Sequence, residues 1–418
     1  MTPGLFTTLF LAALTVSVGL QLWLAARQRR HVLAHRDAVP AHFDQRISLA
    51  AHRKAADYTV ARSRFATVEI LLDAIVLLLL TLGGGLAWLA HFTATLPVPP
   101  VFRDVVLVVA VALIAGALSL PLAWYRTFVL EQRFGFNRTT LSLWIADVVK
   151  GALIGAALGV PLLTLVLWLM ERAGAWWWLG AWIAWVAFQA LVLVLYPTVI
   201  APLFNTFRPL TDAGVRERIE RLLARCGFAA KGLFVMDGSK RTAHGNAYFT
   251  GFGAARRIVI FDTLIERLAP EEIEAVLAHE LGHFKLRHVL KRAAWFALGS
   301  LVLLAVLGWL VGEPWFYAGL GVPGPAPRYG VALVLFMLAL PVFTFVATPL
   351  AASYSRRHEY EADQYAAGHA SAQALVEALV KLYEDNASTL TPDPLYSAFY
   401  DSHPPASTRI ARLESAPA

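Results

Sequence analysis

The chain has 418 residues, of which 58% are hydrophobic and only 16% are charged, and it contains 13 Trp. This composition is typical of a membrane protein and argues against the two or three soluble domains that the length alone would suggest. The net charge of +7 does not indicate nucleic-acid binding, because the basic residues lie beside apolar segments, where positive-inside topology accounts for them.

Seven apolar segments are long enough to cross a bilayer, which requires about 20 residues per helix. They are residues 4–26, 68–92, 105–125, 151–170, 176–198, 293–311 and 330–352. The first is expected to be a retained span and not a cleaved signal, because Arg27, Arg29 and Arg30 follow it instead of preceding it. In the second, Glu69 and Asp73 share a helix face, which indicates either a water-lined surface or a pairing with another helix.

The connections between the spans predict their orientation. The 27–66 segment carries nine Lys or Arg and the 126–150 segment four, whereas the 93–104, 171–175 and 312–329 segments carry one each. Because basic connections face the cytoplasm, the 199–292 segment and the chain from 353 are both expected there. The predicted parts are spans one to five (1–198), a metalloprotease segment (199–292), spans six and seven (293–352) and a cytoplasmic tail (353–418).

The 199–292 segment has the pattern of a small α/β unit. Residues 216–223 are expected to form a helix, and the apolar residues 232–236 and 257–261 are expected to form short strands. Between these strands lies an apolar and aromatic stretch that is expected to be extended, Asn246, Ala247, Tyr248 and Phe249. A peptide could add to such a strand; the alternative is a hairpin that only covers the neighbouring helix.

The sequence His279-Glu280-Leu-Gly-His283 indicates a metal site. An acidic first turn from Pro270 and apolar residues at helical spacing predict a helix here, on which residues four apart lie on one face. His279 and His283 can therefore hold one metal ion, and the Glu280 carboxylate beside them can take a proton from the attacking water. The alternative is a surface helix with two chance histidines. The single cysteine, Cys226, excludes a cysteine-based zinc cluster.

A hydrolytic zinc site usually has three protein ligands, so a third is expected. Glu359 and Asp363 are four apart just after the seventh span, and an antiparallel pair of spans would bring them to the two histidines. Glu359 can complete the site, and Asp363 can accept a hydrogen bond from the free ring nitrogen of a metal-binding histidine. Glu361 is the competing carboxylate, but it lies about 160° away from this face. Two imidazoles and a carboxylate favour one Zn²⁺ per chain.

These motifs resemble the type I CAAX prenyl proteases, which are integral-membrane zinc metalloproteases. The resemblance rests on His279-Glu-Leu-Gly-His283, Glu359-Tyr-Glu-Ala-Asp363 and Asp237-Gly-Ser-Lys-Arg241 leading to Asn246-Ala-Tyr-Phe249, together with Arg133-Phe-Gly-Phe-Asn137, Ile200-Ala-Pro-Leu-Phe-Asn205 and Ser402-His-Pro-Pro405 with Arg409. It extends from just after the third span almost to the end of the chain.

The resemblance implies a polytopic, all-α membrane protein in which seven helices ring a water-filled chamber. A cytoplasmic zinc protease domain of the gluzincin type, with a small β-sheet, would cap it. By similarity, Asn246 and its neighbours are the edge strand that aligns the substrate, His403 steadies the tetrahedral intermediate, and Arg409 supports the site. His244, His288 and His358 are interpreted as ordinary polar residues, which are not part of the site.

The function predicted is that of a membrane-embedded zinc endopeptidase acting on a peptide or protein, near a prenylated C-terminal cysteine as the resemblance implies. The Ala/Leu/Arg-rich composition favours a bacterial chain in the inner membrane, so a membrane-protein quality-control protease is the alternative. A non-catalytic lipid-binding or transport protein would need no base such as Glu280, and an aminopeptidase for soluble peptides would need no spans. Membrane lipid is an expected partner and nucleic acid is not; the oligomeric state is not predicted.

Overall fold

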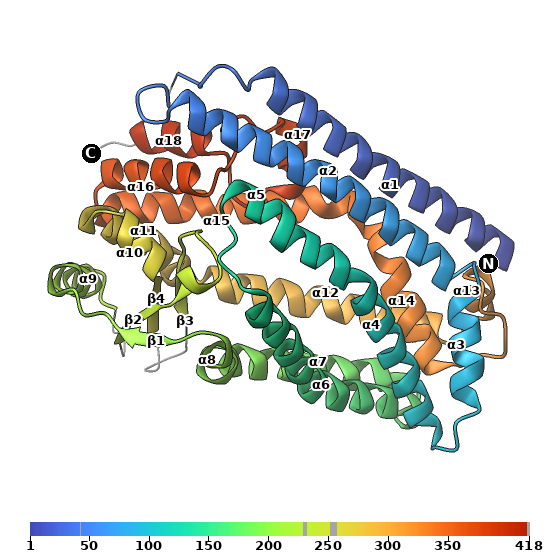
Figure 1. Cartoon of the computed structure of the whole chain (residues 1–418). Helices are drawn as coiled ribbons and strands as arrows, with labels where there is room; N and C mark the ends of the chain where they lie inside the picture. Colours follow the sequence, from blue (N-terminus) through green and yellow to red (C-terminus); the bar gives the residue numbers. More distant parts are fainter. Residues whose placement is uncertain (42, 229–231, 251–256, 416–418) are drawn as a thin grey trace.

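The computed structural model describes residues 1–418 except 42, 229–231, 251–256 and 416–418. Long helices form most of the molecule, and a smaller unit with a four-stranded sheet lies at one end of them (Figure 1). The helical region comprises α1 (Pro3–Ala34), α2 (Leu49–Leu80), α3 (Gly85–Ala94), α4 (Pro100–Tyr125), α5 (Gln132–Phe134), α6 (Leu141–Arg172), α7 (Trp177–Leu195), α8 (Ala201–Phe204), α12 (His288–Leu310), α13 (Pro314–Gly319) and α14 (Tyr329–Thr344).

Two of these helices extend well beyond the apolar segments that predicted them. α1 and α2 have 32 residues each, and such helices are about 48 Å long, against about 30 Å for the apolar layer of a bilayer. Most of the basic 27–66 segment is therefore helical. Its side chains attach α1 to other elements: Arg36 donates to both oxygens of Asp57 on α2 at 2.8 Å, and Arg27 donates to Asp393 near the C-terminus at 2.9 Å.

Among the described residues, six helices are long and apolar enough to cross a membrane, or seven if the bent pair α2–α3 is one span. The predicted number of seven corresponds to the larger count. The predicted span 68–92 is not one straight helix, because α2 and α3 meet at 48°. Three consecutive glycines make this bend: Gly84 has a φ of 79°, and a Cβ on Gly83 would lie 2.8 Å from the carbonyl oxygen of Leu79.

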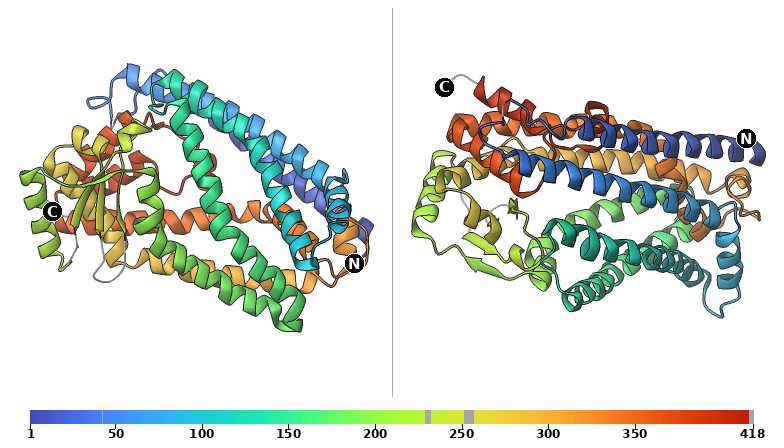
Figure 2. Two further views of the ribbon diagram at one scale, coloured as in Figure 1. Left: turned by 60° about the horizontal axis from the view of Figure 1, so that its bottom comes forward. Right: turned by 45° about the horizontal axis from the view of Figure 1, so that its top comes forward.

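The long helices spread apart towards the sheet (Figure 2). α1 packs along α2, α4 packs along α6 and α14, and α7 packs along α12. Two hollows of about 540 and 470 Å³ lie along α1, α2 and α17 (Pro394–Tyr400). Both are lined by Ser63, Ala66, Glu69, Arg126, Tyr396 and Tyr400. Glu69 is ion-paired with Arg126, so this carboxylate both lines a hollow and pairs with another segment.

The sheet contains β1 (Phe207–Pro209), β2 (Gly232–Met236), β3 (Ala247–Thr250) and β4 (Arg257–Phe261), in the order β1-β2-β4-β3. β2 and β4 are parallel, and the two outer strands are antiparallel to their neighbours. The strands predicted at 232–236 and 257–261 are confirmed, and the predicted helix at 216–223 is the middle of α9 (Ala213–Arg225). β1 was not predicted. β3 lies at one edge of this sheet.

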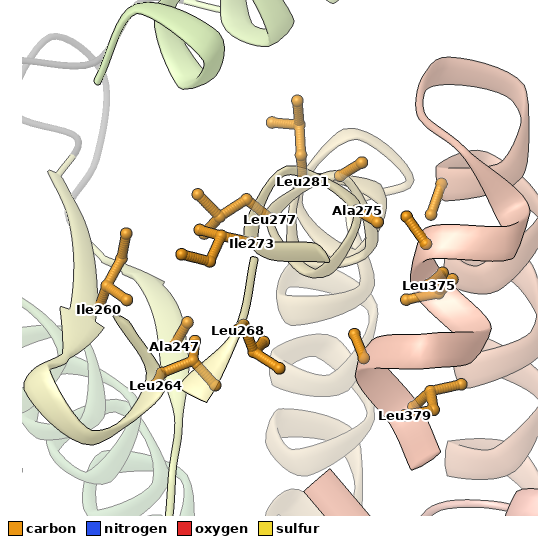
Figure 3. Packing of buried hydrophobic residues seen from close by; sticks show 14 of the residues in the cluster. Ala247, Ile260, Leu264, Leu268, Ile273, Ala275, Leu277, Leu281, Leu375 and Leu379 are labelled. Atoms are coloured by element: carbon orange, nitrogen blue, oxygen red, sulfur yellow. The ribbon is translucent and has the colours of Figure 1, made fainter. Parts of the chain in front are cut away.

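The core of the smaller unit is built around α11 (Pro270–Lys285), which lies between the sheet and α16 (Ala372–Asp385) (Figure 3). Ile273 and Leu277 point towards the side of the sheet, and Ala275 points towards Leu375 on α16. Burying a Leu or Ile side chain stabilises a fold by roughly 1.5–3 kcal/mol, so this packing holds α11 firmly. The remaining helices are α10 (Asp262–Arg267), α15 (Thr348–His369) and α18 (Ala406–Glu414).

A partly buried ion pair attaches the smaller unit to the long helices. Arg241, just ahead of β3, donates to both oxygens of Asp147 on α6 at 2.8 and 3.0 Å. The same guanidinium donates to the Asn205 side chain at 3.0 Å. A bidentate pair of this kind fixes orientation as well as distance. The Asp237–Arg241 motif therefore positions the sheet relative to the α6 helix.

Candidate metal centre

α11 carries His279 and His283 four residues apart and therefore on one face, and contacts at its N-terminus stabilise this helix. Pro270 occupies its first turn, and the Glu272 carboxylate accepts a hydrogen bond from the Ala269 backbone N–H at 2.7 Å. The same carboxylate is paired with Lys381 on α16 at 2.7 Å. Acidic groups at a helix N-terminus are stabilising. These contacts fix the helix from which His279 and His283 project.

Glycine allows α11 to lie very close to α15. A Cβ added to Gly282 would lie 3.0 Å from the Cβ of Tyr365, 3.1 Å from the Cα of Ala362 and 3.2 Å from the Ala362 carbonyl oxygen. Two of these three atoms belong to the α15 backbone and cannot rotate away. Gly282 immediately precedes His283, and Ala362 immediately precedes Asp363. The close approach therefore brings the histidines of α11 to the carboxylates of α15.

Ligand groups of three residues from these two helices meet at one point. His279 Nε2 lies 3.2 Å from His283 Nε2, and the Glu359 carboxylate lies 3.4 Å from both nitrogens, through Oε2 to His279 and through Oε1 to His283. His279 and Glu359 are buried, and His283 is partly buried. These are the three residues that the sequence predicts as ligands.

This arrangement fits a zinc ion. Tetrahedral zinc with bonds of about 2.0–2.1 Å places its ligand atoms about 3.3 Å apart, close to the separations found here. The Glu359 Oε2 atom is buried and, among the described residues, has no hydrogen-bond partner. Burial disfavours the charged form of His279, but the hydrogen bond with Asp363 and the neighbouring Glu359 carboxylate, 3.4 Å away, outweigh it and raise the pKa of this ring to about 9. The pocket is thus suited to a positive charge between the three ligands.

The second nitrogen of His279 is held by a buried ion pair. Asp363 Oδ1 lies 2.8 Å from His279 Nδ1. Arg409 on α18 donates to both Asp363 oxygens, at 2.8 and 2.6 Å, and all three side chains are buried. Arg409 can only donate, so Asp363 is the acceptor for both partners. This leaves the lone pair of His279 on Nε2, which faces the other ligands.

Glu280 and His403 border the same point. Glu280 follows His279 on α11, is partly buried, and has its pKa raised by that burial. His403 Nε2 lies 3.5 Å from Glu359 Oε1, and its Nδ1 lies 3.1 Å from the Ser402 hydroxyl. The imidazole is 63% exposed and lines the 540 Å³ hollow. A substrate in that hollow would therefore meet His403 beside the ligand group.

β3 runs beside α11 and, within the part of the chain that the structure describes, pairs with a strand on one side only. The Asn246 carbonyl accepts the Phe261 N–H at 2.9 Å, so Asn246 and Tyr248 face β4 in the antiparallel pattern. Ala247 and Phe249 consequently direct their N–H and C=O groups away from β4. The Ala247 N–H is also 2.9 Å from the Asn246 side-chain oxygen. All four residues proposed for substrate binding thus lie on or next to an edge strand adjacent to the metal-site helix.

A second group of three metal-binding side chains lies on the other side of His283. His288, His358 and Glu361 place their ligand atoms within 4.8 Å of one another. His288 also contacts His283 directly, because the Nδ1 atoms of the two rings are 3.0 Å apart. Sequence reasoning treats His288 and His358 as ordinary polar residues and misses this contact. The only sequence signal for this contact is that His288 lies five residues after His283, close to a motif that already contains two histidines.

Comparisons with known proteins agree with this geometry. Residues 28–206 match the family described as CAAX prenyl protease N-terminal, five membrane helices, and residues 209–416 match peptidase family M48. The CAAX prenyl protease 1 homolog of Arabidopsis thaliana is 34% identical over 88% of each chain, and CAAX prenyl protease 1 of Saccharomyces cerevisiae is 36% identical over 71% of this chain and 68% of its own. The chain belongs to the CAAX prenyl protease 1 family.

The fold of this family member also matches a solved structure. Ste24p of S. mikatae superposes with a TM-score of 0.91 and 29% identity, covering 98% of this chain and 99% of that one. The predicted family, the polytopic helical fold with a small sheet and the enzyme class are therefore confirmed. The chain is an integral-membrane zinc metalloendopeptidase of family M48.

Proposed function

We propose that this chain holds one zinc ion with His279, His283 and Glu359 and hydrolyses a peptide bond near the prenylated C-terminal cysteine of a protein substrate. The observation that carries the metal site is the convergence of His279 Nε2 and His283 Nε2, which lie 3.2 Å apart, on the Glu359 carboxylate, whose two oxygens each lie 3.4 Å from one of these nitrogens. The substrate class rests on the names of the family relatives.

When bound, zinc supplies a Lewis acid that polarises the scissile carbonyl and lowers the pKa of water towards about 7. Glu280 acts as general base: it takes the proton of the attacking water and returns it to the leaving amine nitrogen. Its raised pKa suits both steps, because a carboxylate with a higher proton affinity is the stronger base. Asp363 and Arg409 keep the His279 ring in the orientation that directs Nε2 to the ligand group.

His403 is proposed to stabilise the oxyanion. Its Nε2 atom lies beside Glu359 and faces an open hollow, so an N–H there can donate to a developing negative charge. The hydrogen bond with Ser402 restrains the ring from its other side. Donors that are already in position when charge develops need no rearrangement during the reaction.

The substrate backbone is proposed to pair with β3. The outward C=O groups of Ala247 and Phe249 and the outward N–H of Phe249 are spaced for an antiparallel or parallel partner strand, while the Ala247 N–H donates to the Asn246 side chain. Main-chain pairing does not depend on the identity of the substrate side chains. It therefore suits an enzyme that selects its scissile bond by the position of that bond near the C-terminus of the substrate. β3 contacts α11, so a peptide on its open edge would run alongside the metal-site helix.

The two hollows are proposed to hold the lipidated end. The larger begins at His403, and through shared residues such as Ala66 and Tyr400 it meets the second hollow. That second hollow continues between the membrane helices, where Ile70 and Leu122 line it beside Asp73. An isoprenoid attached close to the scissile bond would thus reach apolar side chains at membrane depth.

We also propose that the site faces the cytoplasm, in a bacterial inner membrane whose lipid surrounds the spans. The basic segments 27–66 and 126–150 lie on the same side as the smaller unit in the predicted topology, and positive charge favours the cytoplasmic face. The bacterial assignment rests on the Ala/Leu/Arg-rich composition. Accessibility labelling of cysteines introduced at 388 and at 97 in sealed vesicles would test the orientation.

The experiment that tests the proposed function compares one peptide in prenylated and unprenylated forms, with products identified by mass spectrometry. Wild-type protein should cleave the prenylated form faster, and Glu280→Gln should lose cleavage by about 10²- to 10⁴-fold, the usual contribution of a general base. Equal cleavage of both forms would favour a quality-control protease. Undiminished activity of Glu280→Gln would refute the role of this residue.

A further inference from the structure

The side-chain group formed by His288, His358 and Glu361 has the composition of a metal site but lies in contact with a ligand of another one. Glu361 Oε2 lies 3.0 Å from His288 Nε2, and the His358 ring stacks on His288 at 4.0 Å with an interplanar angle of 8°. His288 is completely buried. The group can therefore either bind a second metal ion or support the first.

The chain turns sharply to bring His288 to this place. α11 ends at Lys285 and α12 begins at His288, and Arg287 between them has a left-handed φ of 59°. In a continuous helix, His288 would lie about 140° from His283, at about 100° per residue. The left-handed residue folds the start of α12 back, so that the two Nδ1 atoms are 3.0 Å apart. Non-glycine residues in this conformation are uncommon and often mark functional sites.

Proton positions decide between the two possibilities. His283 Nε2 faces His279 and Glu359, so in the metal-bound protein it carries no proton, and Nδ1 carries one. His283 Nδ1–H must then donate to His288 Nδ1, which is the acceptor. His288 consequently has its own proton on Nε2, where it donates to Glu361 at 3.0 Å. The other oxygen of Glu361 accepts from Arg357 at 3.1 Å.

A metal ion on His288 Nε2 would be incompatible with this direction of proton donation, from His283 to His288 and from His288 to Glu361. It would move the ring proton to Nδ1, and two N–H groups would then oppose each other across 3.0 Å. The two sites therefore exclude one another. His358 is buried, and among the described residues its Nδ1 has no hydrogen-bond partner, as expected either for a ligand or for a ring that serves as a stacking surface. Tyr354 packs edge-on against its ring at 4.3 Å.

We propose that His288 and Glu361 are positioning residues for the zinc ligand His283, and that the three-residue group is not a second metal site. This inference rests on the proposed metal centre. Each acidic residue of the Glu359–Asp363 motif then has its own role. Glu359 completes the ligand set, Asp363 orients His279 directly, and Glu361 orients His283 through His288. Partners of this kind usually contribute 10- to 100-fold to metal affinity.

The decisive experiment measures zinc per chain by elemental analysis and the zinc dissociation constant by chelator competition, on full-length protein in detergent. Wild type should bind one zinc. His288→Leu removes the acceptor and should weaken zinc binding by about 10- to 100-fold. His288→Asn should restore most of the affinity, because its side-chain oxygen can accept the His283 N–H. Glu361→Gln, at a partly exposed position, keeps an acceptor but loses the charge and should weaken binding less than His288→Leu.

His358→Phe is the matched control, because it keeps an aromatic ring stacked on His288 and removes any ligand atom. It should leave the zinc count and the dissociation constant unchanged. Two zinc ions in wild type, falling to one in His358→Phe, would overturn the inference in favour of a second metal site. Wild-type affinity in both His288→Leu and Glu361→Gln would overturn it as well. A wild-type protein that binds no zinc would refute the metal centre itself, a result distinct from these.

Discussion

The close approach of α11 and α15 at Gly282 predicts that one added methyl group will damage the metal site. In Gly282→Ala the new Cβ would lie 3.0 to 3.2 Å from three α15 atoms, two of them in the backbone. Carbon atoms pack at about 3.5–4.0 Å, so the helices would have to separate by about 0.4 Å. Metal–ligand distances tolerate about 0.2 Å, so Glu359 would move out of reach of good coordination.

The two effects of this substitution can be separated. Overpacking costs about 1–3 kcal/mol, while alanine gains about 1 kcal/mol over glycine in a helix, so the fold should lose at most about 2 kcal/mol. Zinc affinity, measured by chelator competition, should fall by tenfold or more. The melting temperature of the zinc-free protein, measured in parallel, reports the effect on the fold alone. Gly368→Ala on α15 is the control, because a Cβ there meets no atom within 4 Å. Wild-type zinc affinity in Gly282→Ala would refute the reasoning.

Two further predictions concern the same centre, and a third concerns the edge of β3. His279 retains its proton up to a pKa of about 9, and zinc must displace that proton to bind. The apparent zinc affinity should therefore rise by about tenfold per pH unit from neutral pH and level off near pH 9. A flat profile above pH 7 in chelator-buffered titrations would contradict this. Asp363→Asn should weaken zinc binding by about 10- to 100-fold. It also leaves the buried Arg409 unpaired and should lower the free energy of unfolding by about 3–5 kcal/mol. Adding Arg409→Met should recover the melting temperature but not the zinc affinity, and recovery of both would contradict the proposed role of Asp363. Phe249→Pro removes one outward N–H of β3 and should raise KM while leaving zinc content unchanged; an unaltered KM would argue against strand addition at this edge.

Local patterns predicted much of the protease unit. α11 begins at Pro270 as its acidic first turn indicated, and β2 and β4 occupy the predicted residues, because their apolar runs are bounded by turn residues. Helical spacing also chose Glu359 over Glu361, and the structure brings Glu359 to the two histidines. These features follow from short-range periodicity, which the sequence displays directly.

Other features depend on contacts that no local pattern reveals. β1 has only three residues, too few to show a strand period, and it exists because it pairs with β2. The bend between α2 and α3 lies within one apolar run, in which hydropathy outweighs the glycines at 83–85. The contact between His288 and His283 was not predicted, because helical spacing places His288 away from His283 and only the left-handed turn at Arg287 returns it.

The most direct test of the metal centre is zinc content and peptide cleavage measured together in three purified proteins. Wild type should contain one zinc per chain and cleave, Glu280→Gln should keep the zinc and not cleave, and Glu359→Ala should lose both. That pattern would assign the metal to α11 and α15 and the base to Glu280. A Glu359→Ala protein that retains zinc and full activity would contradict the account.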